Sequence, residues 1–343
     1  MKKYSFNKKV SIAGRKIGDG EKIFVIAEAG VAHFGSIKRA FKLVDVAVDA
    51  GADAVKFQVF KTENLVSSIA PDWIKRLKPK ELPYDSFRKI KSYCDKKGIL
   101  FFATAHDEES ADFIEDLGVP AVKIGSGEVK NLPFISHIAR KRKPLIISTG
   151  LHSLEDIHDI LDECSKEGIK QIVLMHCITA YPAPLSEVNL SAIRTMKETF
   201  NVPVGYSDHT VGVTIPLASV AAGACVIEKH ICLDKKTKSS QDCRVACDRK
   251  DFSGFIKAVR EIEAAIGDGK KVVSASSKKS MSWARKSIVT ACKLSAGHKL
   301  SPEDIVFKRP GTGMPPVDAK KVIGRRLVRD IERDNLILWK HLK

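Results

Sequence analysis

The sequence predicts a (β/α)₈ TIM barrel followed by a small second domain, and three observations support this fold class. Short runs rich in β-branched residues alternate with amphipathic stretches, a pattern typical of a parallel sheet covered by helices. Eight such units occupy about 250 residues, the usual size of a TIM barrel. Polar residues also end nearly every expected strand. An open doubly wound sheet is the alternative, but no G-x-G-x-x-G follows the first expected strand.

The chain divides into four parts. We expect a hairpin over 1–20, the barrel over 21–268, a linker over 269–283 and a small domain over 284–343 that KRPGTGMPP interrupts. The expected barrel strands are, in order, KIFVIAEAG, DAVKFQVF, ILFFATAH, AVKIGSGE, PLIISTG, QIVLMHC, VPVGYSDH and CVIEKHIC. The stretches between them are expected to be helices, several of which end in glycine, a common C-cap.

Composition narrows the class of protein. The net charge is +17, but basic residues stand beside acidic ones on the expected helices, so we expect no nucleic-acid partner. A positive field can still steer anionic substrates. No run of about 18 apolar residues predicts a membrane span, and MKKYSFNKKV is not a secretory signal. Eight cysteines without a C-x-x-C indicate a reduced, cytoplasmic chain, and a metal site at Cys243 and Cys247 would need further ligands.

Polar side chains gather at the ends of the expected strands. Any one of them could be a core hydrogen-bonding residue or a helix cap, but the same feature on eight strands predicts an active site at the carboxyl end of the barrel. In strand order they are Glu28; Lys56 and Gln58; Thr104 and His106; Lys123, Ser126 and Glu128; Ser148 and Thr149; Thr179 and Tyr181; Ser207, Asp208 and His209; and Glu228, Lys229 and His230.

The alternation of side chains along a strand sharpens this site. Ser207 shares a face with His209, and Glu228 shares one with His230. Neighbouring strands lie about 4.8 Å apart, so the two histidines can hold one divalent cation between them. Two imidazoles with open positions suit Mn²⁺ or another catalytic metal.

The fourth strand complicates the pattern. Lys123 has the opposite parity to Ser126 and Glu128, so either the glycines of KIGSGE bend the chain or Lys123 faces elsewhere. Lys56 shares a face with Gln58 on the second strand. The two lysines, with nearby hydroxyls, can bind a phosphate and a carboxylate.

Two chemistries remain open for such a set of residues. A lysine can form a Schiff base with a carbonyl substrate, as in a class I aldolase. Alternatively the lysines stay charged as anion binders beside a metal, which the histidine pair favours. A third hypothesis is a sugar or nucleic-acid binder without enzymatic activity that exploits the positive charge.

The chain resembles the sialic acid synthase family over nearly its whole length. The motifs that carry the resemblance are IAEAGVAHFGS, GADAVKFQ, AVKIGSGE, LIISTG, HCITAYPAP, GYSDHT and EKHI, followed by KSIVTACKLSAGHKLSPEDIVFKRPGTGMPP and VIGRRLVRDI. The tail is similar to the antifreeze-like SAF domain that these synthases carry. This resemblance implies a transferase that condenses phosphoenolpyruvate with a hexosamine aldehyde, with C–O cleavage, to give a nine-carbon sugar acid and phosphate.

The resemblance also implies roles for individual residues. His209 and His230 would hold a divalent metal, for which Mn²⁺ is the first candidate and Mg²⁺ and Co²⁺ are the alternatives. The protein would be a domain-swapped homodimer in which the partner subunit's Arg309 reaches the sugar. The implied catalytic residues are Glu28, Lys56, Lys123 and Glu128. The implied substrate-binding residues are Gln58, Thr104, Ser126, Ser148, Thr179, Tyr181, Ser207, Glu228, Asp242 and Arg309.

Three departures from the family pattern fall where the sugar would bind. Ala32-His33 replaces Asn-His, Ala105-His106 replaces Pro-Phe, and Ser240-Gln241-Asp242-Cys243 replaces Gly-Pro-Asp-His. The acceptor sugar therefore has three candidates: N-acetylmannosamine, its 6-phosphate, and a modified sugar leading to legionaminate or pseudaminate. We expect N-acetylmannosamine.

Overall fold

The computed structural model describes residues 4–237 and 241–343. Ser240, one of the three departures noted above, lies outside this range. The chain forms two compact units, Met1–Gly267 and Asp268–Lys343. Within the described residues, no helix combines the length and the apolar character needed to cross a bilayer.

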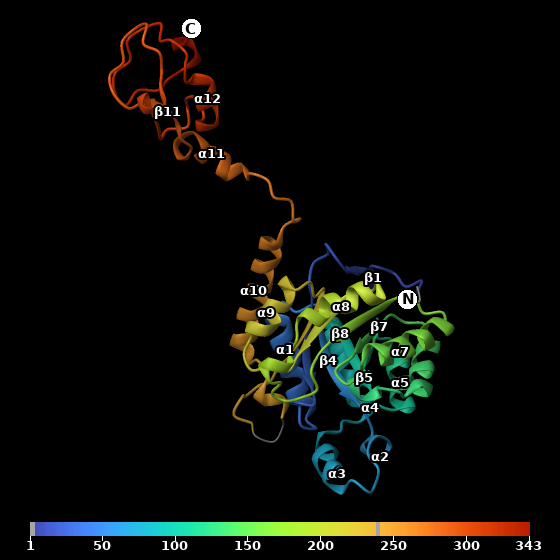
Figure 1. The fold of residues 1–343 in the computed structure, drawn as a ribbon. Helices are drawn as coiled ribbons and strands as arrows, with labels where there is room; N and C mark the ends of the chain where they lie inside the picture. The colour runs from blue at the N-terminus through green and yellow to red at the C-terminus, as the bar shows by residue number, and fades with distance from the viewer. Residues whose placement is uncertain (1–3, 238–240) are drawn as a thin grey trace. The chain divides into compact units, whose positions relative to one another are not determined.

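The first unit is a closed barrel of parallel strands, as the sequence predicts (Figure 1). Consecutive strands are neighbours, and β10 closes the barrel by pairing with both β3 and β9. The barrel strands are β3 (Phe24–Gly30), β4 (Ala54–Val59), β5 (Leu100–Ala105), β6 (Val122–Ile124), β7 (Leu145–Ser148), β8 (Ile172–His176), β9 (Val204–Asp208) and β10 (Val226–His230).

Helices cover the outer face of the barrel (Figure 1). The long ones are amphipathic, and polar caps fix where several begin; the side chain of Ser153, for example, accepts a hydrogen bond from the backbone of Asp156. Such a cap contributes about 1 kcal/mol. The helices are α1 (Ile37–Ala50), α2 (Thr62–Leu65), α3 (Pro71–Leu77), α4 (Tyr84–Lys97), α5 (Glu108–Asp116), α6 (Leu132–Arg140), α7 (Leu154–Lys166), α8 (Ser191–Phe200), α9 (Thr214–Ala221) and α10 (Arg249–Ile266).

An amino-terminal hairpin closes one end of the barrel. It consists of β1 (Val10–Ile12) and β2 (Arg15–Ile17), which pair antiparallel within the range expected for it. Its apolar side chains join a buried cluster with residues at the amino ends of the strands, among them Phe24 and Phe102, whose rings stack at 5.8 Å. The barrel is therefore filled with apolar side chains at this end.

A buried ion pair lies on the outward face of two barrel strands. The Lys229 Nζ atom donates to Asp208 Oδ2 at 2.5 Å and to the Thr210 carbonyl at 2.9 Å. Both charged side chains are fully buried. They have the opposite parity to His209 and His230, so the pair joins β9 to β10 on the side that faces the helices.

The second unit has its own small core. The stretch expected to be a linker includes a helix, α11 (Ala275–Ala284), because the Ser274 side chain caps its start; none of its residues is buried. Strands β11 (Ser287–Thr290) and β12 (Ile305–Lys308) pair antiparallel, and α12 (Ala319–Val322) follows. Its buried core residues are Ile288, Leu294, Leu300, Ile305, Met314, Val322, Leu327, Ile331 and Ile337.

Short 3₁₀ helices complete both units. They are η1 (Lys78–Lys80), η2 (Ser126–Glu128), η3 (Leu185–Glu187), η4 (Asp242–Arg244), η5 (Pro302–Asp304), η6 (Pro316–Asp318) and η7 (Trp339–His341).

Candidate active site

A polar cavity of about 180 Å³ lies at the carboxyl ends of the barrel strands. It brings together most of the residues that the sequence predicts for the site, from all eight strands or the loops that follow them. Its lining residues are Glu28, Lys56, Gln58, Thr104, His106, Lys123, Gly125, Ser126, Gly127, Ser148, Cys177, Thr179, Tyr181, Ser207, His209, Glu228 and His230.

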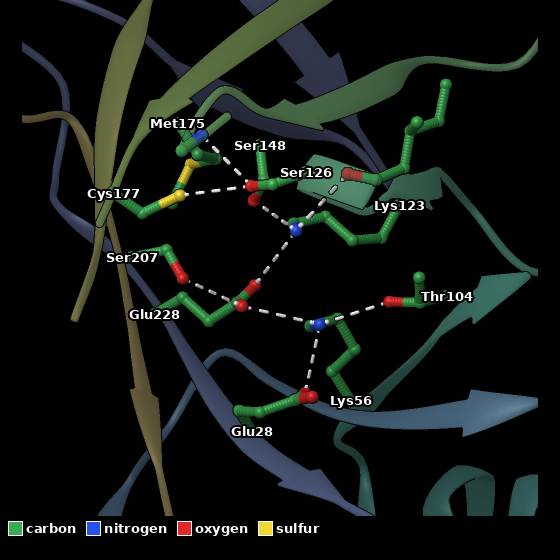
Figure 2. A network of polar contacts seen from close by, with 12 residues as sticks. Glu28, Lys56, Thr104, Lys123, Ser126, Ser148, Met175, Cys177, Ser207 and Glu228 are labelled. Atoms are coloured by element: carbon green, nitrogen blue, oxygen red, sulfur yellow. Dashed lines mark hydrogen bonds and ion pairs between the residues drawn. The ribbon is translucent and has the colours of Figure 1, made fainter. Parts of the chain in front are cut away.

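Lys56 is the centre of one polar cluster in the cavity (Figure 2). Its Nζ atom lies 3.0 Å from Glu28 Oε2 and 3.3 Å from Glu228 Oε1. It also donates to Thr104 Oγ1 at 3.1 Å. All these side chains are buried, so the ammonium group is fixed by two opposite charges and a hydroxyl.

Lys123, on β6, faces the same cavity. Its Nζ atom donates to Ser148 Oγ at 2.6 Å and lies 3.9 Å from Glu228 Oε2. Figure 2 shows the Glu228 carboxylate reaching between the two ammonium groups. Ser207 Oγ donates to Glu228 Oε1 at 3.1 Å. The two lysines and the two glutamates therefore form a nearly neutral network inside the barrel.

The parity problem of the fourth strand is resolved by the end of β6. The strand stops at Ile124, and η2 begins at Ser126, so alternation no longer applies after Gly125. Both Lys123 and Ser126 line the cavity as a result. Glu128 does not; its carboxylate accepts a hydrogen bond from Asn131 Nδ2 at 2.7 Å.

Burial and the lysines drive the pKa values of the two glutamates apart. Burial raises the pKa of Glu28, and although Lys56 opposes this, Glu228 adds to it, which brings the value to about 7. Burial acts in the same direction on Glu228, but Lys123 and Lys56 outweigh it and lower the pKa. Burial would likewise lower the pKa of Lys56, but Glu228 and Glu28 raise it. Burial lowers the pKa of Lys123, against the opposing effect of Glu228.

The backbone of Gly150 approaches Ser126 closely and positions its side chain. Its Oγ atom accepts a hydrogen bond from the Gly150 amide at 3.0 Å and lies 3.3 Å from Cys177 Sγ. A Cβ atom at Gly150 would lie 2.5 Å from Thr179 Oγ1, so only glycine fits here. Cys177 has the same parity as Thr179 and Tyr181, a signal by which the sequence could have revealed it.

The histidines form the opposite side of the cavity. The ring centroids of His209 and His230 are 5.4 Å apart. His209 Nδ1 lies 2.6 Å from the Ile178 carbonyl, which fixes the proton on Nδ1 because a carbonyl only accepts. His209 Nε2 is then an acceptor for the Tyr181 hydroxyl at 2.9 Å. Burial, followed by His230, lowers the pKa of His209 to about 4, and burial also lowers that of His230, so both rings are neutral.

The donor chemistry of this pair fits a divalent metal. A neutral imidazole whose Nδ1–H is held by a carbonyl presents its Nε2 lone pair, the usual state of a metal-binding histidine. Within the described part of the chain no group of three or more His, Cys, Asp or Glu is arranged to hold an ion. Solvent or substrate would have to supply the remaining ligands. Cys243 packs with Cys232 and Ala246 in a separate buried cluster, and all eight cysteines are free thiols.

Asp242 and Arg309 are two predicted residues that do not line the cavity. Asp242 belongs to η4, and its charge reaches the site: burial and then Asp242 raise the pKa of Tyr181. Arg309 belongs to the second unit, where its guanidinium carbon lies 5.5 Å from the centroid of the Trp283 ring.

The fold and the cavity together define a (β/α)₈ barrel whose carboxyl-end cavity holds two buried lysines beside a pair of imidazoles. Residues 43–271 match the NeuB family and residues 285–343 match the SAF domain. The chain belongs to the NeuB family.

Relatives of known name agree with this assignment. The chain is 38% identical to the N,N'-diacetyllegionaminic acid synthase of Campylobacter jejuni, over 92% of this chain and 99% of that one. It is 30% identical to the human N-acetylneuraminate-9-phosphate synthase, over 95% and 94% of the two chains. The crystal structure of the N-acetylneuraminic acid synthetase of Leptospira borgpetersenii, in complex with citrate, superposes with a TM-score of 0.76 at 33% identity and covers 80% of this chain and 95% of that one. The protein is thus an enzyme of the nonulosonic acid synthase type.

Proposed function

We propose that this protein condenses phosphoenolpyruvate with an N-acetylated hexosamine to give a nonulosonic acid and phosphate. The observation that carries the proposal is the single cavity in which Lys56 and Lys123 face a pair of neutral histidines. The first group suits a small dianion or trianion, and the second suits a metal that polarises an oxygen.

The lysine side would bind phosphoenolpyruvate. Each ammonium group lies beside a carboxylate and a hydroxyl, so an incoming phosphate or carboxylate can replace a carboxylate partner and keep the ammonium charge paired. The hydroxyls beside them are further donors. They belong to Thr104, Ser126, Ser148 and Ser207.

Glu28 would handle the proton of the condensation. When the methylene carbon of phosphoenolpyruvate attacks the sugar aldehyde, the aldehyde oxygen gains charge and takes up a proton. A carboxyl group with a pKa of about 7 can donate it near neutral pH. Gln58 Nε2 donates to Glu28 Oε1 at 3.2 Å and orients the group.

His209 and His230 would hold the metal, for which Mn²⁺ is our first candidate. When bound, the metal would polarise a carbonyl oxygen of the acceptor or activate water. The Ile178 carbonyl holds the His209 ring in the tautomer that such a role needs. We further propose a cytoplasmic homodimer in which the partner subunit's Arg309 contacts the sugar.

The relatives bear on the choice of acceptor. N-acetylmannosamine is the acceptor that the motifs first suggest. Identity to the two diacetyllegionaminate synthases, 38% and 36%, exceeds the 30% identity to the neuraminate-9-phosphate synthase. This difference favours, as a second candidate, a hexosamine that carries two acetamido groups.

A phosphate-release screen tests the proposal. Purified protein, phosphoenolpyruvate and Mn²⁺ are incubated with N-acetylmannosamine, its 6-phosphate and diacetamido hexoses, and the products are analysed by mass. We expect release only with an acceptor and a product whose mass is the sum of acceptor and pyruvate. A pyruvate adduct trapped on lysine by borohydride, without phosphate release, would instead support the aldolase. Release unaffected by a chelator would contradict the role of the metal.

A further inference from the structure

His106 lines the cavity but has no role in the function proposed above. It follows β5 directly and precedes Asp107, whose side chain caps α5. It has the same parity as Thr104, two positions earlier, and both side chains line the cavity. The imidazole is therefore one layer nearer the mouth than the hydroxyl that contacts Lys56.

Packing fixes the ring of His106 in place. It lies edge-on to Phe60, with ring centroids 6.2 Å apart. On the other side, a Cβ atom at Gly125 would lie 3.8 Å from both the His106 ring and the Thr104 methyl group. An apolar aromatic residue would satisfy these contacts equally well, so packing alone does not explain a histidine.

The polar edge of the ring has no partner in the protein. His106 Nε2 is shielded from solvent and makes no hydrogen bond. A buried, unpaired ring nitrogen is unfavourable, and such groups in native structures call for an explanation. A ligand in the cavity would supply the missing partner.

The electrostatic surroundings identify the charge of that partner. The charges that act on His106 are those of Lys56, then Asp107, then Lys123. Asp107 caps α5, so the two of them that line the cavity are both positive. Burial, followed by Lys56 and Lys123 and opposed by Asp107, lowers the pKa of His106 to about 4, so the ring is neutral. A neutral imidazole beside two ammonium groups favours an anion, to which it donates its one N–H without adding charge.

We propose that His106 is a substrate-binding residue that donates a hydrogen bond from Nε2 to the phosphate of phosphoenolpyruvate held by Lys56 and Thr104. This inference rests on the proposed function for the identity of the anion. It gives the replacement of the family's Pro-Phe by Ala105-His106 a consequence in affinity for phosphoenolpyruvate and not in the choice of sugar.

Two variants separate the hydrogen bond from the packing. His106→Phe keeps the ring and the contact with Phe60 but has no donor, whereas His106→Gln keeps a donor near the Nε2 position. We expect the KM and the calorimetric Kd for phosphoenolpyruvate to rise about tenfold in His106→Phe and less in His106→Gln. The kcat and the KM for the hexosamine should stay within about twofold. His137→Phe, on the outer helix α6, is the matched control and should match the unmodified protein.

Several results would overturn the inference. They are an unchanged Kd for phosphoenolpyruvate in His106→Phe, an effect confined to the hexosamine, and no binding of phosphoenolpyruvate to the unmodified protein. If the unmodified protein binds phosphoenolpyruvate but releases no phosphate with any acceptor, the proposed function fails while the Kd comparison still decides the role of His106. If His106→Phe does not fold, ¹⁵N-histidine NMR of the unmodified protein decides, because phosphoenolpyruvate must shift the His106 Nε2 resonance.

Discussion

The two sides of the cavity differ in their electrostatics: one is built from ion pairs and the other from neutral imidazoles. On the lysine side, Lys56 and Lys123 are interlocked with Glu28 and Glu228. On the histidine side, His209 and its neighbour are neutral, and a backbone carbonyl fixes the tautomer. The first side can bind an anion only by exchanging partners, whereas the second offers lone pairs.

This difference teaches how one barrel end can hold two ligands of different character. Ion pairs placed next to the imidazoles would compete for their lone pairs, and protonated imidazoles would repel a metal. Glu228 shares β10 with His230, but its carboxylate pairs with Lys56 and Lys123, so the ammonium groups are engaged by carboxylates and not by the imidazoles. Variants of the two sides should therefore fail in different ways, which the following predictions exploit.

The largest effect should come from Lys123→Met, which removes a buried cation from the anion-binding side. We expect phosphate release to fall about a thousandfold or more, since a charge that stabilises the departing phosphate is lost. Phosphate-release kinetics and phosphoenolpyruvate calorimetry measure this. Lys229→Met is the matched control, because Lys229 is buried but pairs with Asp208 on the outward face; it should lower the Tm and leave the kcat/KM of folded protein unchanged. Equal kinetic losses in both variants would contradict the division of roles.

His209→Ala should produce the next largest effect, and of a different kind. We expect metal retention and phosphate release each to fall about a hundredfold, because half of the protein's ligand pair is lost. Binding of phosphoenolpyruvate measured without metal should persist. Elemental analysis after gel filtration and release assays with and without chelator give the result. His152→Ala, outside the cavity lining, serves as control. Unchanged metal content in His209→Ala would refute the metal assignment.

Arg309→Ala should have a smaller effect, limited to the sugar. We expect the KM for the hexosamine to rise about tenfold and the Kd for phosphoenolpyruvate to stay unchanged. Arg325→Ala is a close control, since Arg325 also lies over a tryptophan, Trp339, in the same unit. A loss of phosphoenolpyruvate binding in Arg309→Ala, or an equal effect of Arg325→Ala, would count against the role of Arg309.

Tyr181→Phe should give the smallest change. The variant keeps the ring but removes the hydroxyl that occupies His209 Nε2, so we expect metal affinity to rise about threefold. Metal titration followed by calorimetry measures it. Weaker metal binding would mean that the hydroxyl supports the metal and does not compete with it.

Much of the fold and site could be predicted from strand ends and parity. Parity predicted that Ser207 shares a face with His209 and Glu228 with His230, and all four line the cavity. Asp208 and Lys229, also named at these strand ends, pair with each other on the outward face. Parity was less useful where strands end early: β6 stops before Ser126, so Glu128 turns away from the cavity. Thr179 and Tyr181 were predicted from their place after the sixth strand, whereas Cys177, which also lines the cavity there, was not.

Other features need contacts that a linear pattern does not contain. The unpaired Nε2 atom of His106 and the close approach at Gly150 depend on neighbours from other strands. The helix α11 within the expected linker depends on a serine cap in a stretch that is otherwise low in apolar residues. Local composition predicted only a linker there, and it did not predict the helix within it.

The hairpin that fills the amino end of the barrel determines how ligands enter and leave the cavity. Because β1 and β2 seal that end with apolar side chains, every molecule that reaches the cavity passes through the same opening. Whatever binds deeper must enter first and can leave only after the outer ligand has gone. Because the barrel is closed at one end, we expect substrates to bind and products to leave in a fixed order, so that the kinetic mechanism is ordered and not random.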